Sequence, residues 1–218
     1  VANVQVVLGG AVVPAAVKAL AGRYADGSVR SVAVQFSATA GPVPLLGEVN
    51  VLSVAVAQPV WKPVPADTAV ALLPRDPAYL LATGFFGTTL PVAQTRSAMY
   101  ERQFVTGADK FWSVDGASWG ARNYYDRSQS HYVYWSRSGQ AKWFFRAAAL
   151  ARNYRRGYIE PSGYNPRPHW AQLEGLALNY WLTGDDSSRV AVVQSAVRMT
   201  GAFRPAIIGT QGGPTRKV

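Results

Sequence analysis

The chain has 218 residues, with 22 Lys and Arg against 12 Asp and Glu, and a formal net charge of +10. Hydrophobic residues make up 49% of it, which excludes a disordered protein and predicts a buried core. Cysteine is absent, which excludes disulfides, thiolate metal sites and cysteine nucleophiles. The positive charge favours anionic partners: an acidic glycan, a nucleic acid, a lipid surface or an acidic protein.

The first part of the chain, residues 1–73, is predicted to be β-structure. Val-rich, partly alternating segments are separated by Gly and Pro, as is typical of short strands. These segments are VQVVL, SVRSVAVQF, VNVLSVAVA and TAVALL. In ADGSVRSVAVQF, Asp26-Gly27 predicts a turn, and Val32, Val34 and Phe36 fall on one face that we expect to be buried. The sequence therefore predicts a small antiparallel barrel or sandwich.

Residues 74–120 show a weaker pattern. A short helix is predicted after Asp76-Pro77, because Asp caps helices and Pro fits the first helical position. Gly107, Gly116 and Gly120 interrupt the rest of the region. It is predicted to be a long connecting segment, of a kind that is often functional or wraps another surface.

Residues 121–203 have the period of α-helices. Along Ala141–Arg156, apolar residues recur at i, i+4, i+7, i+8 and i+11 from Trp143, while the cations lie elsewhere on the helix. The predicted helices span 124–138, 140–156, 169–183 and 186–201. Tyr-Trp followed by a glycine closes two of them, at Gly139 and Gly184, and this echo predicts two helical hairpins. The remaining residues, 204–218, are predicted to form a flexible tail.

Together these patterns predict an α+β protein in which an antiparallel β-barrel or sandwich precedes a helical-hairpin domain, a partial α/α-toroid. ADGSVRSVAVQF resembles a strand of the RIFT-like β-barrel that precedes an α/α-toroid in exo-rhamnogalacturonan lyase-like proteins. YDRSQSHYVYWSRSGQAKWFFRAAALARNY and HWAQLEGLALNYWLTGDD are similar to successive hairpins of such a toroid. The resemblance implies a reduced or truncated version of that fold and a surface for polysaccharides. Modules of this kind also suit a phage tail or fibre.

Glu174 is the candidate catalytic acid. Trp170 and Trp181 lie close to it in angle on the predicted helix, and apolar rings disfavour the charged form of a carboxylic acid, which raises its pKa. His169, just before the helix, could act as a base. The alternative for Glu174 is an ordinary salt bridge to a neighbouring helix, and the alternative for His169 is a capping or packing role.

The candidate substrate-binding residues are the two indoles together with cations and a phenol on the preceding hairpin. They are Trp170, Trp181, Arg127, Arg152 and Tyr132. No metal site is predicted, because two histidines without cysteine would need carboxylates to complete it and no HExxH spacing occurs. No nucleotide-binding fingerprint is present either, so no cofactor is expected.

Two functional hypotheses follow. The first is a carbohydrate-recognition module of a secreted or virion assembly, such as a phage tail or fibre, with polysaccharide lyase or glycosidase activity left open. The second is a purely structural virion protein, completed by neighbouring subunits and without catalysis. The expected partners are an acidic or neutral glycan and other protein subunits. Nucleic-acid binding and membrane insertion are not expected, and the expected location is extracellular or in a virion.

Overall fold

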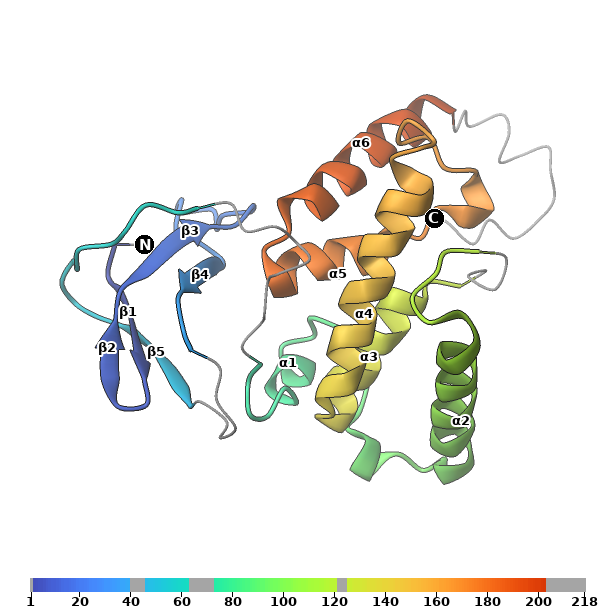
Figure 1. The fold of residues 1–218 in the computed structure, drawn as a ribbon, viewed down its shortest axis with the longest axis horizontal. Coiled ribbons are helices and arrows are strands. Elements are labelled where there is room, and N and C mark those ends of the chain that lie inside the picture. Colours follow the sequence, from blue (N-terminus) through green and yellow to red (C-terminus); the bar gives the residue numbers. More distant parts are fainter. Residues whose placement is uncertain (1, 40–45, 63–72, 121–124, 203–218) are drawn as a thin grey trace. The chain divides into compact units, whose positions relative to one another are not determined.

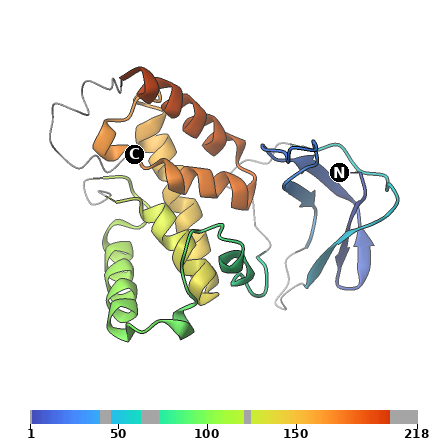
Figure 2. The same ribbon diagram turned by 180° about the vertical axis from the view of Figure 1, so that it is seen from behind.

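The computed structural model describes residues 2–39, 46–62, 73–120 and 125–202 of the chain. The chain divides into two compact units, 1–72 and 73–218. Strands occur in the first unit and helices in the second, as Figure 1 and, from behind, Figure 2 show. The α+β class is therefore confirmed.

The first unit contains two small antiparallel sheets. Strands β1 (Val4–Leu8), β2 (Ala11–Val13) and β5 (Gly47–Val51) form one sheet in the order β2-β1-β5, and β3 (Ala15–Ala19) pairs with β4 (Val32–Phe36) in the other. A two-residue turn of Gly9 and Gly10 joins β1 to β2. Both residues have positive φ, and glycine is suited to these positions because such turns require left-handed backbone at both.

The predicted Asp26-Gly27 turn is confirmed. The Gly27 N–H donates to the Tyr24 carbonyl at 2.9 Å, the Tyr24 N–H donates to Ser28 at 3.0 Å, and Gly27 has a φ of 80°. The expected contrast between the two faces of β4 is not present, since all five of its residues are half-buried.

Three of the four predicted strand segments contain strands, namely β1, β4 and β5. The fourth, TAVALL, lies almost wholly outside the described residues. Strands β2 and β3 were not predicted, because Pro14 interrupts the apolar run between them. The described strands form two separate ladders rather than one continuous ladder.

The second unit contains six α-helices, two 3₁₀ turns and one π-helical turn among its described residues. The helices are α1 (Tyr79–Ala82), α2 (Ala98–Asp115), α3 (Arg127–Ser138), α4 (Ala141–Tyr154), α5 (Leu173–Thr183) and α6 (Asp186–Ala202). The shorter elements are η1 (Val92–Gln94), the π turn η2 (Arg155–Ile159) and η3 (Pro168–Trp170).

The four helices predicted in this unit are confirmed as α3, α4, α5 and α6. Gly139 and Gly184 end α3 and α5 in the left-handed conformation, with φ of 70° and 74°, as expected for glycines just past a helix. The short helix predicted after Asp76-Pro77 is α1, and the Asp76 carboxylate accepts the Ala78 N–H at 2.8 Å.

The prediction of a connecting segment over 74–120 missed helix α2. This helix has 18 residues and is capped by Ser97, whose hydroxyl accepts the Tyr100 N–H. Gly107, read from the sequence as an interruption, lies in the middle of it. Tertiary contacts outweigh the low helix propensity of glycine here, because Glu101 pairs with Arg137 of α3 and Asp109 pairs with Arg146 of α4.

The core of the second unit lies between α3, α4, α5 and α6. Its fully buried side chains include Tyr132 and Trp135 of α3 and Trp143 of α4. A second part of the core joins the end of α4 to the C-terminal helices. Its residues are Ala151, Tyr154, Ile159, Leu176 and Ala191. Many of the rings that are concentrated in this part of the sequence are therefore packing residues.

Candidate binding groove

The site predicted around Glu174, with Trp170 and Trp181 beside the acid, is not an enclosed cavity in the structure. Glu174 and His169 are exposed, and Trp170 and Trp181 are half-buried. Trp170 packs edge-on against Trp119, with ring centroids 5.7 Å apart, and none of these candidates lines either of the two cavities described below.

The reason is the rotation of α5 about its axis. The sequence predicts an apolar stripe of Leu173, Leu176, Ala177, Tyr180 and Trp181. The helix buries Leu176 and Tyr180 of this stripe together with Gly175 and Asn179, while the other three residues of the stripe are half-buried. Glu174 therefore points to solvent, and the apolar enclosure expected for it does not exist.

Two close contacts between α3 and α5 fix this rotation. Asp126 accepts the Gln129 N–H at 2.8 Å, which caps α3, and also accepts the Gly175 N–H at 2.7 Å in the first turn of α5. A Cβ atom at Gly175 would lie 2.6 Å from the Ser128 Cβ and 2.9 Å from the Gln129 nitrogen, so only glycine fits.

Burial raises the pKa of Asp126 to about 7, against the opposing effect of the backbone N–H groups that donate to it, and the charge of Glu174 adds to the increase. A raised carboxyl pKa is typical of a general acid, and glycoside hydrolysis usually uses two carboxylates, so Asp126 is a candidate partner for Glu174. Both of its oxygens are occupied by backbone N–H groups, however. The adjoining cavity has a volume of about 10 Å³, which is room for about one water molecule. Asp126 therefore serves to join two helix N-termini.

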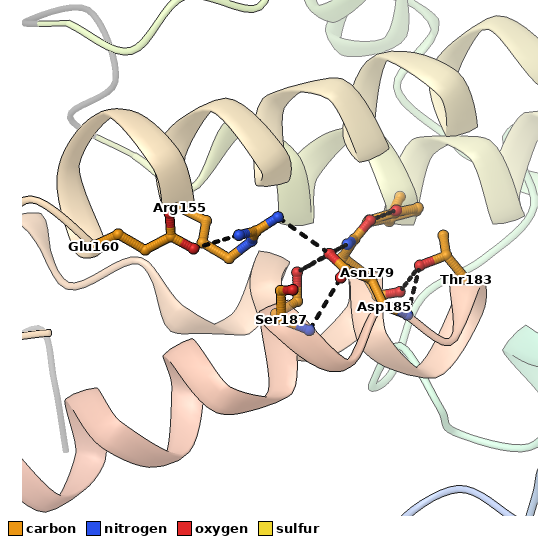
Figure 3. Close-up of polar contacts among 8 residues, drawn as sticks. Arg155, Glu160, Asn179, Thr183, Asp185 and Ser187 are labelled. Atoms are coloured by element: carbon orange, nitrogen blue, oxygen red, sulfur yellow. Dashed lines mark hydrogen bonds and ion pairs between the residues drawn. The ribbon is translucent and has the colours of Figure 1, made fainter. Parts of the chain in front are cut away.

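The candidate Tyr132 belongs to a second polar connection, whose part around Asn179 and Asp185 is shown in Figure 3. The Tyr132 hydroxyl donates to Asn179 Oδ1 at 2.7 Å, and Asn179 Nδ2 donates to Asp185 at 3.1 Å and to Ser188 at 2.9 Å. Arg155 of the π turn lies 3.8 Å from the same Asp185 carboxylate and also pairs with Glu160. Tyr132 is fully buried, and burial raises its pKa, so it is a core residue and not a ligand contact.

The structure places the two candidate cations on different helices, Arg127 on α3 and Arg152 on α4. Arg127 lines the 10 Å³ cavity, and its guanidinium donates to the Gly116 carbonyl at 3.3 Å. Burial lowers the pKa of Arg127. Arg152 is half-buried near the end of α4.

The larger of the two cavities is a groove between α2 and α3, with a volume of about 190 Å³. Two residues of α2 and five of α3 line it: Tyr100, Phe104, Gln129, Ser130, Val133, Tyr134 and Arg137. The spacing of these residues puts them on one face of each helix. We call this cavity the α2–α3 groove. Sequence reasoning missed it because α2 itself was missed; the signal was the i, i+4 pair of rings in YERQF.

Rings form the apolar part of the α2–α3 groove. Phe104 stacks on Tyr134, with centroids 4.4 Å apart and an angle of 23° between the rings. Beneath them, His131 stacks on Trp143 at 5.3 Å, and burial lowers the pKa of His131 to about 3, so its ring stays neutral. Tyr100 stands at the rim with 56% of its surface exposed.

Polar groups complete the α2–α3 groove. The Arg137 guanidinium donates to the Leu90 carbonyl at 2.7 Å and pairs with Glu101. The Ser130 hydroxyl donates to the Asp126 carbonyl at 2.9 Å, which leaves its oxygen able to accept. Gln129 contributes a half-buried amide. The groove thus combines stacked rings with hydrogen-bond donors and hydrogen-bond acceptors.

Within the described residues, no group of three or more His, Asp or Glu side chains could hold a metal ion. In the same part of the chain, none of the helices has the length and apolar character needed to span a membrane. Comparison of the chain with protein-family models, with curated proteins and with solved structures finds no match.

Proposed function

We propose that the protein is a carbohydrate-recognition module and that the α2–α3 groove holds the sugar. The observation that carries the proposal is the exposed Tyr100 ring beside the stacked Phe104 and Tyr134, in a groove that also contains Gln129, Ser130 and Arg137. Sugars present apolar C–H faces to rings and hydroxyl groups to such polar side chains. The resemblance to barrel-and-toroid lyase-like proteins supports the same class of ligand, and the proposed setting is a secreted or virion assembly.

The volume of the groove sets the size of the ligand. Sites that enclose drug-sized ligands have volumes of roughly 300–1,000 Å³. At about 190 Å³, the α2–α3 groove suits one sugar ring, with the rest of a glycan chain lying outside. Binding of a chain end or a single branch fits these dimensions.

Recognition is a better reading of the groove than cleavage. Glycoside hydrolysis usually uses two carboxylates on either side of the scissile bond. No Asp or Glu is among the described residues that line the groove; Glu101 contacts its wall only by pairing with Arg137, and Glu174 and His169 lie outside it. Lyase activity is tested by incubation with a panel of acidic polysaccharides, with unsaturated products detected by ultraviolet absorbance.

Binding is tested with a glycan array and saturation-transfer NMR on the whole chain. Replacing Tyr100 by Ala should weaken binding about 2- to 12-fold, since a ring contact contributes roughly 0.5–1.5 kcal/mol. The matched control is Tyr79→Ala on α1, because Tyr79 is also 56% exposed and lies outside the groove. Equal binding by native protein, Tyr100→Ala and Tyr79→Ala would place the sugar elsewhere. Absence of binding across the array would refute the function.

A second candidate function is a structural subunit of an assembly, and helix α6 favours it. Its buried face carries the small residues Ser188, Ala191 and Ser195. Val190, Val193 and Val197, spaced i, i+3 and i+7, are 38%, 49% and 65% exposed. A helix that turns its valines outward is typical of a surface that a neighbouring subunit covers.

Light scattering coupled to size-exclusion chromatography tests this second function. We expect the native chain to self-associate as its concentration rises, and the variant Val193→Lys/Val197→Lys to remain monomeric. A native chain that is monomeric at all concentrations, with a cooperative thermal transition, would argue against an obligate assembly part.

A further inference from the structure

Gln129 lines the α2–α3 groove and carries a side-chain amide that no described residue uses. The residue is half-buried, and its backbone N–H donates to Asp126 Oδ1 at 2.8 Å. Among the described residues, nothing forms a hydrogen bond with the amide oxygen or the amide nitrogen of its side chain. Neither atom is one of the fully buried polar atoms that lack a partner, so both are open to solvent. A molecule in the groove can therefore reach them.

The other polar side chains that α3 contributes to the groove are partly committed within the chain. The Ser130 hydroxyl donates its proton to the Asp126 carbonyl, so toward a ligand it can only accept. Arg137 has no acceptor, and two of its three guanidinium nitrogens already bond within the chain. Of these three side chains, Gln129 alone presents a free donor and a free acceptor next to each other.

The backbone that carries Gln129 is held in place from two sides. Asp126 caps α3 through the Gln129 N–H, and a Cβ atom at Gly175 of α5 would lie only 2.9 Å from the Gln129 nitrogen. The amide thus extends from a turn that two helices fix. A fixed attachment point reduces the ordering that a bound ligand must impose on its site.

We propose that Gln129 determines the specificity of the α2–α3 groove and that its amide binds two adjacent hydroxyl groups of the sugar. This inference rests on the proposed function. One hydroxyl donates to Oε1 and its neighbour accepts from Nε2, since every hydroxyl can do both. A carboxylate has only acceptors and would leave Oε1 without a donor. The N–H and C=O of a trans amide, such as an acetamido group, point in opposite directions, so that group could meet only one of the two atoms.

The first test removes hydroxyl groups from the sugar and uses the native chain alone. The methyl glycosides of glucose, galactose and mannose are titrated beside analogues that each lack one hydroxyl. Binding is followed by NMR shifts of the Tyr100 and Phe104 rings. Loss of one hydrogen bond should weaken binding about 2- to 12-fold. We expect this loss at two neighbouring positions of the sugar that binds.

The second test removes the amide. Gln129→Leu keeps the size of the side chain and should weaken binding of the complete sugar about 5- to 150-fold, because two hydrogen bonds are lost. The deoxy analogues should then no longer differ from the parent sugar. The matched control is Gln103→Leu, an exposed residue of α2 outside the groove, which should behave like the native chain. Thermal unfolding shows whether each variant folds, and Gln129→Ala replaces Gln129→Leu if the leucine does not fit.

The outcomes separate the two proposals. Losses at two adjacent hydroxyls that disappear in the Gln129 variant support the inference. Ring shifts with no adjacent pair of losses, or with losses that persist in the variant, overturn the inference and leave carbohydrate recognition standing. Failure of these sugars and of the glycan array to shift the Tyr100 and Phe104 signals overturns both.

Discussion

Among the neighbours of helix α3, α5 and α2 are attached to it in opposite ways. Against α5, backbone approaches backbone: the Gly175 N–H donates to Asp126, and no side chain fits at Gly175. Against α2, contact runs through long side chains, namely the Glu101–Arg137 pair and the Phe104–Tyr134 stack. The first arrangement leaves a cavity of about 10 Å³ and the second a groove of about 190 Å³. In this unit, space for a ligand exists where helices are held apart by side chains.

The largest effect is expected where the backbones meet. Gly175→Ala should destabilise the protein by about 3 kcal/mol, because overpacking costs roughly 1–3 kcal/mol and the new Cβ would clash with backbone as well as side-chain atoms. Urea unfolding followed by circular dichroism measures the loss. A change below about 0.5 kcal/mol would mean that α3 and α5 can move apart easily, and the contrast with α2 would disappear.

The rings under the α2–α3 groove should make stability depend on pH. The pKa of His131 is about 3 in the folded protein and about 6.5 when unfolded, so the unfolded chain binds the extra proton between these values. Stability from this group is complete above pH 6.5 and is lost as pH falls, by about 2.7 kcal/mol at pH 4.5. The variant His131→Phe should lack this loss.

Comparing the native protein with the His131→Phe variant isolates the contribution of His131 to the pH dependence of stability. The raised pKa of Asp126 acts in the opposite direction, adding stability as pH falls through about 7, but it is present in both proteins and cancels in the difference. Unfolding free energies are measured for both from pH 7.5 to 4.5. If the unfolding free energies of the two proteins changed equally with pH, His131 would be hydrated rather than buried against Trp143.

The polar connections made by α5 and by α2 should also differ in how much they contribute to stability. Asn179→Ala on α5 should cost about 2 kcal/mol, because the buried Tyr132 hydroxyl loses its partner. Asp109→Ala on α2 should cost less than about 1 kcal/mol, because the Asp109 side chain is 40% exposed and its ion pairs with Lys142 and Arg146 are screened. Thermal unfolding of both variants checks the order, and a larger loss for Asp109→Ala would reverse the comparison.

The smallest effect should be a gain. Gly107→Ala, in the middle of α2, meets no atom within 4 Å and should stabilise the protein by about 0.5–1 kcal/mol through helix propensity. Both this variant and Gly175→Ala replace glycine by alanine, but the expected changes in stability have opposite signs, so the two variants form a matched pair. A loss at Gly107 would indicate that α2 needs the flexibility of glycine there.

Local signals predicted much of the fold. The helices ending at Gly139 and Gly184 followed from apolar period and terminal glycines, and the turn at Asp26-Gly27 followed from residue type. Helix α2 was missed because Gly107 weakens its local signal, while its anchors, Arg137 and Arg146, lie more than 30 residues away in sequence. Non-local pairing of this kind is invisible to a local pattern.

The candidate site was predicted less well than the fold. From hydrophobicity alone, Glu174 is predicted to lie near the edge of the apolar stripe of α5, close in angle to Trp170 and Trp181. The observed orientation is set by Gly175 and by the polar Asn179, which point inward for reasons of steric fit and hydrogen bonding. A helical wheel cannot show that a glycine and an asparagine are the residues a neighbouring helix requires.

The π turn that follows α4 has a consequence for chain length. Tyr154 and Ile159 belong to the same core cluster although they are five positions apart. A π turn joins residues i and i+5, whereas an α-helix joins residues i and i+4. Loss of one residue here, such as the exposed Gly157, would bring Ile159 to the ordinary four-residue separation and still direct it inward. The same deletion inside α3 would turn every later side chain of that helix by about 100°. A one-residue deletion is therefore better tolerated at this π turn than inside α3.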